Sequence, residues 1–250
     1  MSTNFRERLR NHERLLGTIV TLTDSAVAEM LNDLGFDWLF IDGEHAPFTL
    51  ADLKPIFQAS TNAASIVRIP ELSEGTIKQT LDLGADGLII PQIKTAQETE
   101  RIIQYARYAP EGARGVGIGR AHGYGMRFQQ YMDEANHRIS IIVQAEHIEA
   151  VRNIDAIVNV PGVDAILIGP YDLAASMGKM GQVDDPEVTQ AIDSVAEACS
   201  KVEMPVGIFG VTTDAIRPYV KKGYSLLVVG VDTILLGQAA KSIIDSQRDA

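Results

Sequence analysis

The sequence has 250 residues, 46% of them hydrophobic, a formal net charge of -11 and one cysteine. That length suits one domain with a large core, the negative charge disfavours nucleic-acid and membrane partners, and the lone Cys199 excludes an intrachain disulfide. The first residues lack the apolar core of a signal peptide, and no later segment is long and apolar enough to cross a bilayer. We therefore expect one domain over residues 1–250, working in the reducing cytoplasm.

Short runs rich in Val, Ile and Leu recur along the chain and lead into segments with apolar residues three or four positions apart. This pattern predicts eight strands, at residues 17–22, 38–42, 65–69, 87–91, 139–146, 165–170, 205–210 and 226–232. Several runs are apolar without alternation, as in parallel strands covered on both faces. We expect an α/β fold, a single (β/α)8 TIM barrel, because a doubly wound sheet would carry fewer strands and a glycine-rich turn after the first.

Local signals mark the helix ends between these strands. Asp24 or Ser25 is placed to cap a helix, and Gly84 and Gly223 stand where helices end. One long stretch, residues 108–128, is too rich in glycine for a regular helix. Ordered loops of that length are commonly lids or binding loops, and the alternative is a surface excursion without a ligand.

Polar side chains close four of the predicted strands, where the active site of such a barrel lies. These residues are Asp42, Glu44, His45, Arg68, Gln144, Glu146 and Asp172. Glu146 and Asp172 are the candidate metal ligands, because two carboxylates at adjacent strand ends leave positions of a hard cation open for water and substrate. Mg²⁺ or Mn²⁺ suits them, and Co²⁺ is a further candidate. The alternative is that both residues cap the helices that follow.

Arg68 and His45 are the other candidates for chemistry. Arg68 closes an apolar strand and needs an anion, which is either the carboxylate of a 2-oxo acid or, in the plainer alternative, the side chain of Asp42 or Glu44. His45 follows Asp42 at a spacing that a turn can fold into an aspartate-oriented imidazole, the usual arrangement of a general acid or base. The alternative is a solvated histidine.

The stretch FDWLFIDGEHAPFTLADL, together with VRIP, PEGARGVG, VQAE and GVDAILIGPYDL, resembles the class II pyruvate aldolases. That family includes 4-hydroxy-2-oxoheptanedioate aldolase and 2-dehydro-3-deoxyglucarate aldolase, and belongs to the phosphoenolpyruvate/pyruvate-domain superfamily. The resemblance extends from about residue 17 to the LGQAA segment. It implies a metal-dependent lyase that reversibly cleaves a 4-hydroxy-2-oxo acid into pyruvate, or a related acid such as hydroxypyruvate, and an aldehyde.

The resemblance also implies roles for individual residues. Glu146 and Asp172 would bind the metal, Arg68 would steady the enolate, and His45, supported by Asp42, would be the acid/base. The substrate would be oriented by Gln144 and received by backbone amides near Gly169, Pro170 and Tyr171. Tyr171 stands where many members have a small residue, which puts the identity of the aldehyde in doubt. Family members form hexamers, trimers of dimers, in which the last helix is exchanged between subunits.

Three rival functions remain open on the sequence. A Schiff-base aldolase would use Lys94, which follows the fourth strand. A decarboxylase of oxaloacetate, or an enzyme like macrophomate synthase, would pass through the same metal enolate. A non-catalytic barrel would only bind a metal-chelated oxo acid, but the full set of site residues argues against it. The sequence decides neither the aldehyde nor the native metal.

Overall fold

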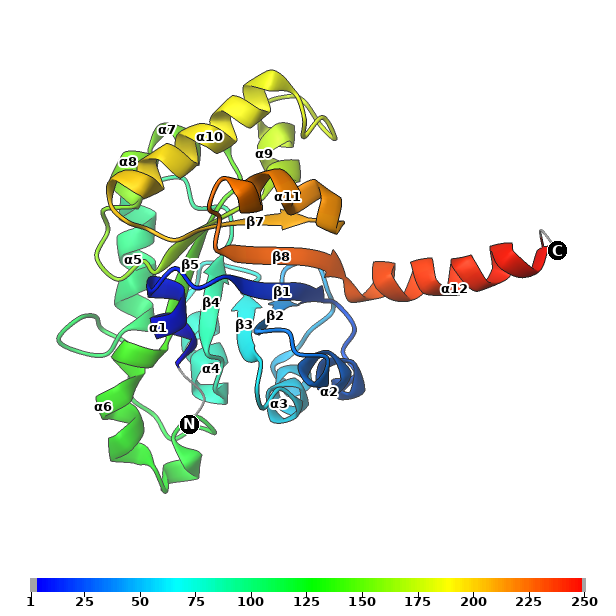
Figure 1. Cartoon of the computed structure of the whole chain (residues 1–250). Coiled ribbons are helices and arrows are strands. Elements are labelled where there is room, and N and C mark those ends of the chain that lie inside the picture. Colours follow the sequence, from blue (N-terminus) through cyan, green and yellow to red (C-terminus); the bar gives the residue numbers. More distant parts are fainter. Residues whose placement is uncertain (1–3, 249–250) are drawn as a thin grey trace.

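Residues 4–248 are described by a computed structural model, and within them eight parallel strands close into a barrel in chain order (Figure 1). The strands are β1 Leu15–Val20, β2 Trp38–Asp42, β3 Ala64–Arg68, β4 Gly87–Ile90, β5 Ser140–Ala145, β6 Ala165–Ile168, β7 Val206–Gly210 and β8 Leu226–Val231. β1 pairs with both β2 and β8, which closes the ring. The predicted barrel and all eight strands are confirmed, although β1 begins two residues before the predicted start.

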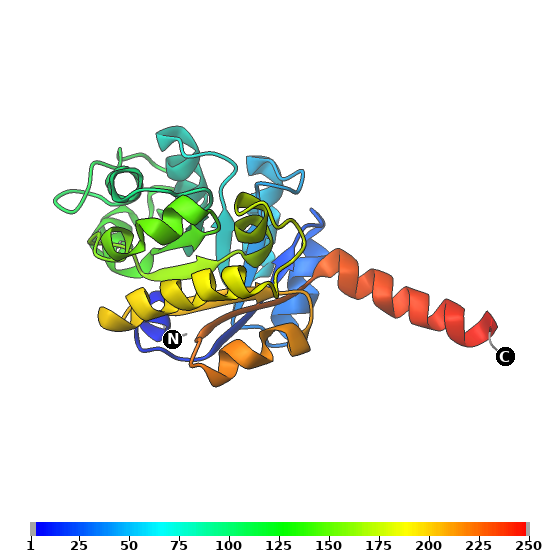
Figure 2. The ribbon, with the colours of Figure 1, turned by 90° about the horizontal axis from the view of Figure 1, so that it is seen from above.

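Most of the helices surround this barrel (Figures 1 and 2). Within the described residues the helices are α1 Phe5–Arg10, α2 Ser25–Asp33, α3 Leu50–Ala59, α4 Glu74–Leu83, α5 Ala96–Ala106, α6 Phe128–Arg138, α7 Ile148–Arg152, α8 Ile154–Ile157, α9 Pro170–Ser176, α10 Pro186–Lys201, α11 Thr213–Lys221, α12 Asp232–Arg248 and the 3-10 turn η1 Gly123–Gly125. Asp24 caps α2 by accepting from the Ala26 backbone N–H, and Gly84 ends α4 with a φ of 100°, as the sequence predicts.

Two apolar layers hold the barrel together. Side chains that point inward, such as Phe40, Ile66, Ile142 and Leu167, fill the barrel interior. The alternate residues of the same strands face the helices and form the larger outer layer. Because side chains alternate along a strand, the residue two positions after an inward-facing core residue also faces the barrel axis. This places Asp42, Arg68 and the Gln144–Glu146 pair at the carboxyl end of the interior.

The two ends of the barrel differ. α1 lies at the end where the strands begin, and its Phe5 ring packs 6.0 Å from the ring of the buried Trp38. α12 leaves from the opposite end and projects away from the body in both views (Figures 1 and 2). Among the described helices, none is long and apolar enough to cross a membrane.

The glycine-rich loop 108–128 does not cover the carboxyl end of its own barrel. Its Ala121 N–H donates to the main-chain oxygen of Asp82, and Arg120 donates to that of Leu83, at the end of α4. His122 inside the loop is fully buried, and its Nε2 lies 3.2 Å from the Tyr108 hydroxyl. The loop therefore packs near the amino-terminal end of the barrel, and whether it binds a ligand stays a prediction.

Candidate functional site

A pocket of about 230 Å³ opens at the carboxyl ends of the strands. Its polar lining consists of His45, Arg68, Gln144 and Asp172, and its backbone rim is formed by Gly169 and Pro170. Its apolar lining consists of Ile19, Phe40, Leu167, Ile168, Tyr171 and Phe209. The structure thus brings together, from four different strand ends, most of the residues that the sequence singles out.

Asp42 and Arg68 form a buried pair across neighbouring strands, because they face each other in the register of β2 and β3. Arg68 donates from Nε to Asp42 Oδ1 at 2.9 Å and from Nη2 to Oδ2 at 2.7 Å. Burial opposes ionisation of Asp42, but the Arg68 hydrogen bond and charge outweigh it and lower the Asp42 pKa. Two donor groups of Arg68, Nε and Nη2, are therefore engaged in a salt bridge within the chain, which is the alternative that the sequence offered for this residue.

The remaining guanidinium nitrogen of Arg68, Nη1, faces another carboxylate. Arg68 Nη1 lies 3.3 Å from Glu44 Oε2, and the Arg68 guanidinium stacks over the Phe40 ring at 5.1 Å. Burial tends to lower the pKa of Arg68, yet Asp42, Glu44 and Glu146 together raise it. Arg68 therefore stays charged, and it presents a fixed positive charge at the floor of the pocket.

His45 lies at the pocket edge in a different orientation from the one predicted. Asp42 Oδ1 accepts from the backbone N–H of His45 at 3.2 Å and of Glu44 at 3.1 Å, so it shapes the turn after β2. The imidazole instead points toward Glu44, with 3.6 Å between His45 Nε2 and Glu44 Oε2. The sequence could not show this, because an aspartate three residues before a histidine can bond to its backbone as well as to its ring.

Glu146 is the most perturbed carboxyl of the site. It is 1% exposed, and its Oε1 accepts from the Gln92 N–H at 2.8 Å and from Gln92 Nε2 at 3.1 Å. Gln144 Nε2 donates to Glu146 Oε2 at 2.5 Å. Burial, followed by the charges of Asp172 and Glu44, raises the Glu146 pKa to about 7 in spite of these donors. A site that crowds negative charge in this way favours a cation.

Asp172 stands opposite, in the first turn of α9. It is solvent-exposed and lines the pocket, and its charge reaches Glu146. Neither carboxylate makes a helix-capping hydrogen bond: α9 has no side-chain cap, and His147 caps α7 by accepting from the Glu149 N–H. Asp172 does lie in the first turn of α9, where the helix N-terminus favours negative charge.

These donors fit a hard divalent cation. Mg²⁺ and its relatives take one or two carboxylates and keep their other positions for water and substrate oxygens, which matches a pair such as Glu146 and Asp172. Within residues 4–248 no group of three or more His, Cys, Asp and Glu side chains is arranged to hold a metal, so a closed all-protein cage is not present. Gln144 Oε1 is buried and has no hydrogen-bond partner among these residues, which leaves one neutral oxygen free to bind.

Gly169 is a spatial requirement of the site. A Cβ at this position would lie 3.0 Å from Gln144 Nε2 and 3.1 Å from Glu146 Oε2. A side chain at this position would therefore crowd both groups, which would have to move by a few tenths of an ångström. Beyond it, Tyr171 packs against Phe209 with ring centroids 6.3 Å apart and gives the pocket an aromatic wall.

Two neighbours of the site were missed by the sequence reasoning: Gln92 and Phe209. Gln92 lies two residues after the end of β4 and has a φ of 54°, and its N–H donates to Glu146. The available signal for Gln92 was a polar residue just after an apolar strand. A neutral glutamine at a strand end indicates a functional site less strongly than a charged residue does. The rival Lys94 does not line the pocket, and its Nζ lies 4.0 Å from Glu149.

Comparisons with known proteins agree with this geometry. A family model described as HpcH/HpaI aldolase/citrate lyase matches residues 16–239. The 2-keto-3-deoxy-L-rhamnonate aldolase of Salmonella gallinarum is 38% identical over 246 residues, which covers 97% of this chain and 92% of that protein. That relative is therefore similar over nearly its whole length.

Solved structures give the same result. A HpcH/HpaI aldolase/citrate lyase family protein from Burkholderia cenocepacia J2315 superposes with a TM-score of 0.95 at 35% identity, covering 98% of this chain and 100% of that one. Macrophomate synthase superposes with a TM-score of 0.83 at 24% identity, covering 99% of this chain and 91% of that one. At that lower identity the likeness extends to the fold alone.

Proposed function

This chain belongs to the HpcH/HpaI aldolase/citrate lyase family, and we propose that Glu146 and Asp172 are the carboxylates that hold its divalent cation. It is a carbon–carbon lyase acting on small molecules, a class II metal-dependent aldolase that reversibly cleaves a 4-hydroxy-2-oxo acid into a 2-oxo acid and an aldehyde. The observation that carries the proposed site is the buried Glu146 carboxyl, whose pKa is raised to about 7 by burial and by neighbouring carboxylates.

The cation we propose is Mg²⁺ or Mn²⁺, because the donors are oxygens. When bound, it would supply positive charge next to the oxo oxygen of the substrate, where negative charge develops as the bond breaks. Gln144 orients the substrate through its free Oε1, and the backbone at Gly169 and Pro170 leaves room for the substrate carboxylate.

Arg68 adds a second, permanent positive charge near the same place. Its bidentate contact with Asp42 fixes the plane of the guanidinium, so the charge is already oriented before the substrate arrives. Because Arg68 keeps its pKa high through Asp42 and Glu44, it does not act as an acid. It stabilises the enolate electrostatically.

His45 is the group we assign to proton transfer. In the cleavage direction its imidazole takes the proton of the 4-hydroxyl, the bond between C3 and C4 breaks, and the electron pair passes to C3 and the 2-oxo oxygen. The aldehyde departs, and a proton delivered to C3 completes pyruvate. Glu44, whose Oε2 lies 3.6 Å from His45 Nε2, places a carboxylate beside the imidazole during this transfer.

The substrate we propose is a 2-keto-3-deoxy sugar acid with an apolar end. The Salmonella relative is named for 2-keto-3-deoxy-L-rhamnonate, which carries a methyl group at the end remote from its carboxylate. The aromatic wall of Tyr171 and Phe209, together with Ile19, offers apolar surface for such a group. A charged aldehyde finds no comparable partner on that wall.

Two measurements test the metal site. Cleavage of 2-keto-3-deoxy-L-rhamnonate should stop after treatment with a chelator and return with Mg²⁺ or Mn²⁺. Mn²⁺ binding, followed by electron paramagnetic resonance, should be lost in Glu146→Gln and retained in the matched control Glu149→Gln, which removes an exposed carboxylate from α7. Full turnover after chelation, or unaltered Mn²⁺ binding by Glu146→Gln, would contradict the proposal.

A panel of acceptors tests the substrate class. With pyruvate as donor, lactaldehyde should condense with a higher kcat/KM than succinic semialdehyde or tartronate semialdehyde, and the preference should shrink in Tyr171→Ala. Oxaloacetate belongs in the same panel, because a decarboxylase would process it faster than any 4-hydroxy-2-oxo acid is cleaved.

We further propose that the enzyme is a homo-oligomer, a hexamer built as a trimer of dimers, in which α12 is exchanged between subunits. Every described residue of α12 after Asp232 is exposed. Its exposed apolar side chains are Ile234, Leu235, Leu236, Ile243 and Ile244. A second barrel is the surface that such a helix requires.

The compartment we propose is the cytoplasm. The single cysteine, Cys199, is buried in α10, and burial raises the pKa of its thiol to about 12. An unpaired, unreactive thiol is compatible with a reducing compartment.

A further inference from the structure

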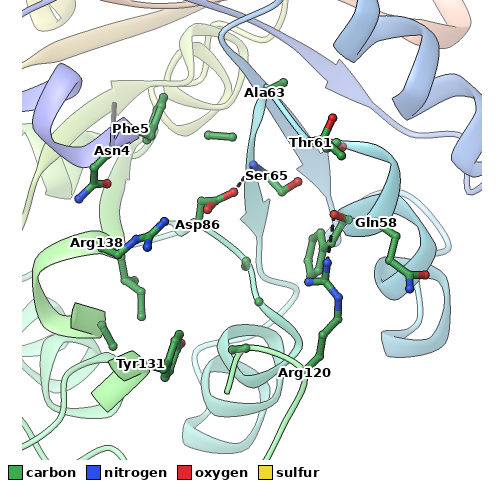
Figure 3. A pocket seen from close by; sticks show the side chains of 18 of the residues that line it. Asn4, Phe5, Gln58, Thr61, Ala63, Ser65, Asp86, Arg120, Tyr131 and Arg138 are labelled. Atoms are coloured by element: carbon green, nitrogen blue, oxygen red, sulfur yellow. Dashed lines mark hydrogen bonds between the residues drawn. The ribbon is translucent and has the colours of Figure 1, made fainter. Parts of the chain in front are cut away.

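A second cavity, of about 970 Å³, lies at the opposite end of the barrel (Figure 3). It opens where β2, β3, β4 and β5 begin, and α1, the end of α3, the loop 120–127 and α6 form its walls. We refer to it as the amino-terminal cavity. None of its lining residues belongs to the candidate active site, and the proposed aldolase reaction gives it no role.

Asp86 forms the floor of this cavity. It directly precedes β4 and lies deep among protein atoms, yet its side chain is open to the cavity. Its Oδ2 accepts from the Ser65 N–H at 2.9 Å, the contact drawn in Figure 3. Burial raises the Asp86 pKa, with the Ser65 N–H and the more distant Arg138 and Arg120 opposing that rise. No salt bridge involves Asp86 among residues 4–248, so this carboxyl can still accept hydrogen bonds.

Positive charge lies on the walls above it. Arg120 donates from Nη1 to the main-chain oxygen of Leu83 at 2.9 Å and from Nη2 to that of Phe57 at 3.3 Å. Neither Arg120 nor Arg127 has a carboxylate within salt-bridge distance in the described part of the chain. On a protein with a net charge of -11, two guanidinium groups without a salt-bridge partner give this cavity local positive charge, which an anionic ligand requires.

The remaining walls carry one ion pair, between Arg8 Nη2 and Asp37 Oδ1 at 2.7 Å, and neutral groups that donate and accept hydrogen bonds. The neutral groups are supplied by Asn4, Gln58, Thr61 and Asn62. Arg138 extends toward Asp86 from the α6 side, and Arg120 lies on the opposite side (Figure 3). The cavity therefore combines the Asp86 carboxyl at its floor, walls that carry neutral polar groups and the Arg8–Asp37 pair, and a cationic side.

We propose that the amino-terminal cavity binds a small polyhydroxylated carboxylic acid of the aldonic type. The carboxylate contacts Arg120 and Arg127, and the hydroxyl groups donate to Asp86 and exchange hydrogen bonds with the amide walls. A phosphorylated ligand is disfavoured because a doubly charged group would lie near the Asp86 carboxyl. The neutral walls favour a chain of hydroxyls over an amino acid, which would use one ammonium at Asp86 and leave the walls unpaired.

D-gluconate is the probe for the full-length enzyme, with Mg²⁺ and pyruvate present at saturation to block the active site. Trp38, the single tryptophan, reports binding by fluorescence because the cavity residue Phe5 packs against it. Calorimetry gives the Kd. We expect gluconate to bind at least about tenfold more tightly than acetate, which lacks the hydroxyls, or sorbitol, which lacks the carboxylate.

Variants locate the binding. Arg127→Gln, at an exposed position, and Arg120→Gln should each weaken gluconate binding about tenfold or more, and Arg101→Gln, an exposed arginine on α5, should leave it unchanged. A crystal soaked in gluconate should show it against Asp86 and Arg120. Wild-type affinity in both cavity variants, binding abolished by pyruvate and Mg²⁺, an empty cavity after soaking, or tighter binding of alanine than of gluconate would each overturn the proposal.

Discussion

Glu146 imposes a pH dependence on the metal-free enzyme. Its pKa is about 7 in the folded protein, against 4.5 for the free side chain. Between these two values the folded state keeps a proton that the unfolded state has released, so the free energy of unfolding falls as the pH rises across this window. In Glu146→Gln that loss disappears, because the amide does not ionise.

We therefore predict that, without metal, Glu146→Gln is more stable than the wild type at pH 8, by about 3 kcal/mol at most, and that the difference vanishes below pH 4.5. Urea denaturation in the presence of a chelator, repeated from pH 4 to pH 8, measures it. Glu149→Gln, exposed on the neighbouring α7, controls for the loss of one charge. An unchanging difference across the pH range would show that Glu146 ionises normally.

Gln92 offers a second prediction about a single residue. Its Nε2 and its backbone N–H both donate to Glu146 Oε1, and its φ of 54° is one that glycine adopts without strain. Gln92→Ala and Gln92→Gly both remove the side-chain donor. We expect each to weaken Mn²⁺ binding about tenfold, because groups that orient a metal ligand contribute that much to affinity.

The two Gln92 variants should differ in stability. Gln92→Gly relieves the left-handed backbone conformation and should exceed Gln92→Ala in free energy of unfolding by about 1 kcal/mol. Calorimetric titration and urea unfolding measure the two effects separately. If Gln92→Gly kept full Mn²⁺ affinity, the backbone N–H alone would orient Glu146.

The sequence predicts single residues well where the strand pattern fixes their direction. Asp42, Arg68 and Gln144 follow inward-facing core residues by two positions and Glu146 follows one by four, so their inward orientation could be deduced. The orientation of the His45 imidazole could not, because it depends on which Asp42 contact the turn selects. The contact between Gln92 and Glu146 could not be predicted either, because the two residues are 54 positions apart in the sequence.

At the scale of elements, the strands were the most predictable part of the molecule. Strands such as β2, β3 and β5 are buried on both faces, so their sequences are mostly apolar and end where the polar site begins. The loop 108–128 was harder, because glycine content indicates only that a segment is irregular. Its packing near the amino-terminal end depends on buried contacts such as those of His122 and Arg114, which no local pattern indicates.

α12 carries a prediction at this scale. Its exposed apolar side chains require a partner surface, and a charge placed among them should separate the subunits. We expect Leu236→Glu to lower the molar mass in solution to that of smaller assemblies. Gln238→Glu, an equal charge on an exposed polar position of the same helix, should leave it unchanged.

Size-exclusion chromatography with light scattering measures the molar mass of both α12 variants. Circular dichroism checks that the barrel of Leu236→Glu remains folded, which is expected because α12 contributes little to the apolar layers of its own chain. An unaltered assembly in Leu236→Glu would contradict the exchanged helix. A monomeric wild type would contradict it as well.

At the scale of the whole molecule, the two ends of the barrel have different roles. The carboxyl end carries the charged residues of the candidate active site, whereas the opposite end is stabilised by a buried ionic cluster around Asp164. Asp164 accepts from Arg6 at 2.7 Å, from Arg10 at 3.0 Å and from Arg107 at 3.0 Å. It also receives the Ile141 N–H, so it ties α1 and α5 to the start of the barrel.

Removing the charge of Asp164 leaves the fully buried Arg107 without a carboxylate, although burial already lowers the Arg107 pKa to about 10. Breaking a buried ion pair on one side typically costs about 3–5 kcal/mol, so we expect Asp164→Asn to lower the Tm by roughly 10 °C. The kcat/KM for aldol cleavage at 25 °C should stay within about twofold of the wild type, because the pocket lies at the other end. Glu146→Gln should show the opposite pattern, with cleavage lost and the fold retained. Differential scanning calorimetry and steady-state kinetics on both variants give the four values, and a large loss of kcat/KM in a folded Asp164→Asn would show that the two ends are coupled.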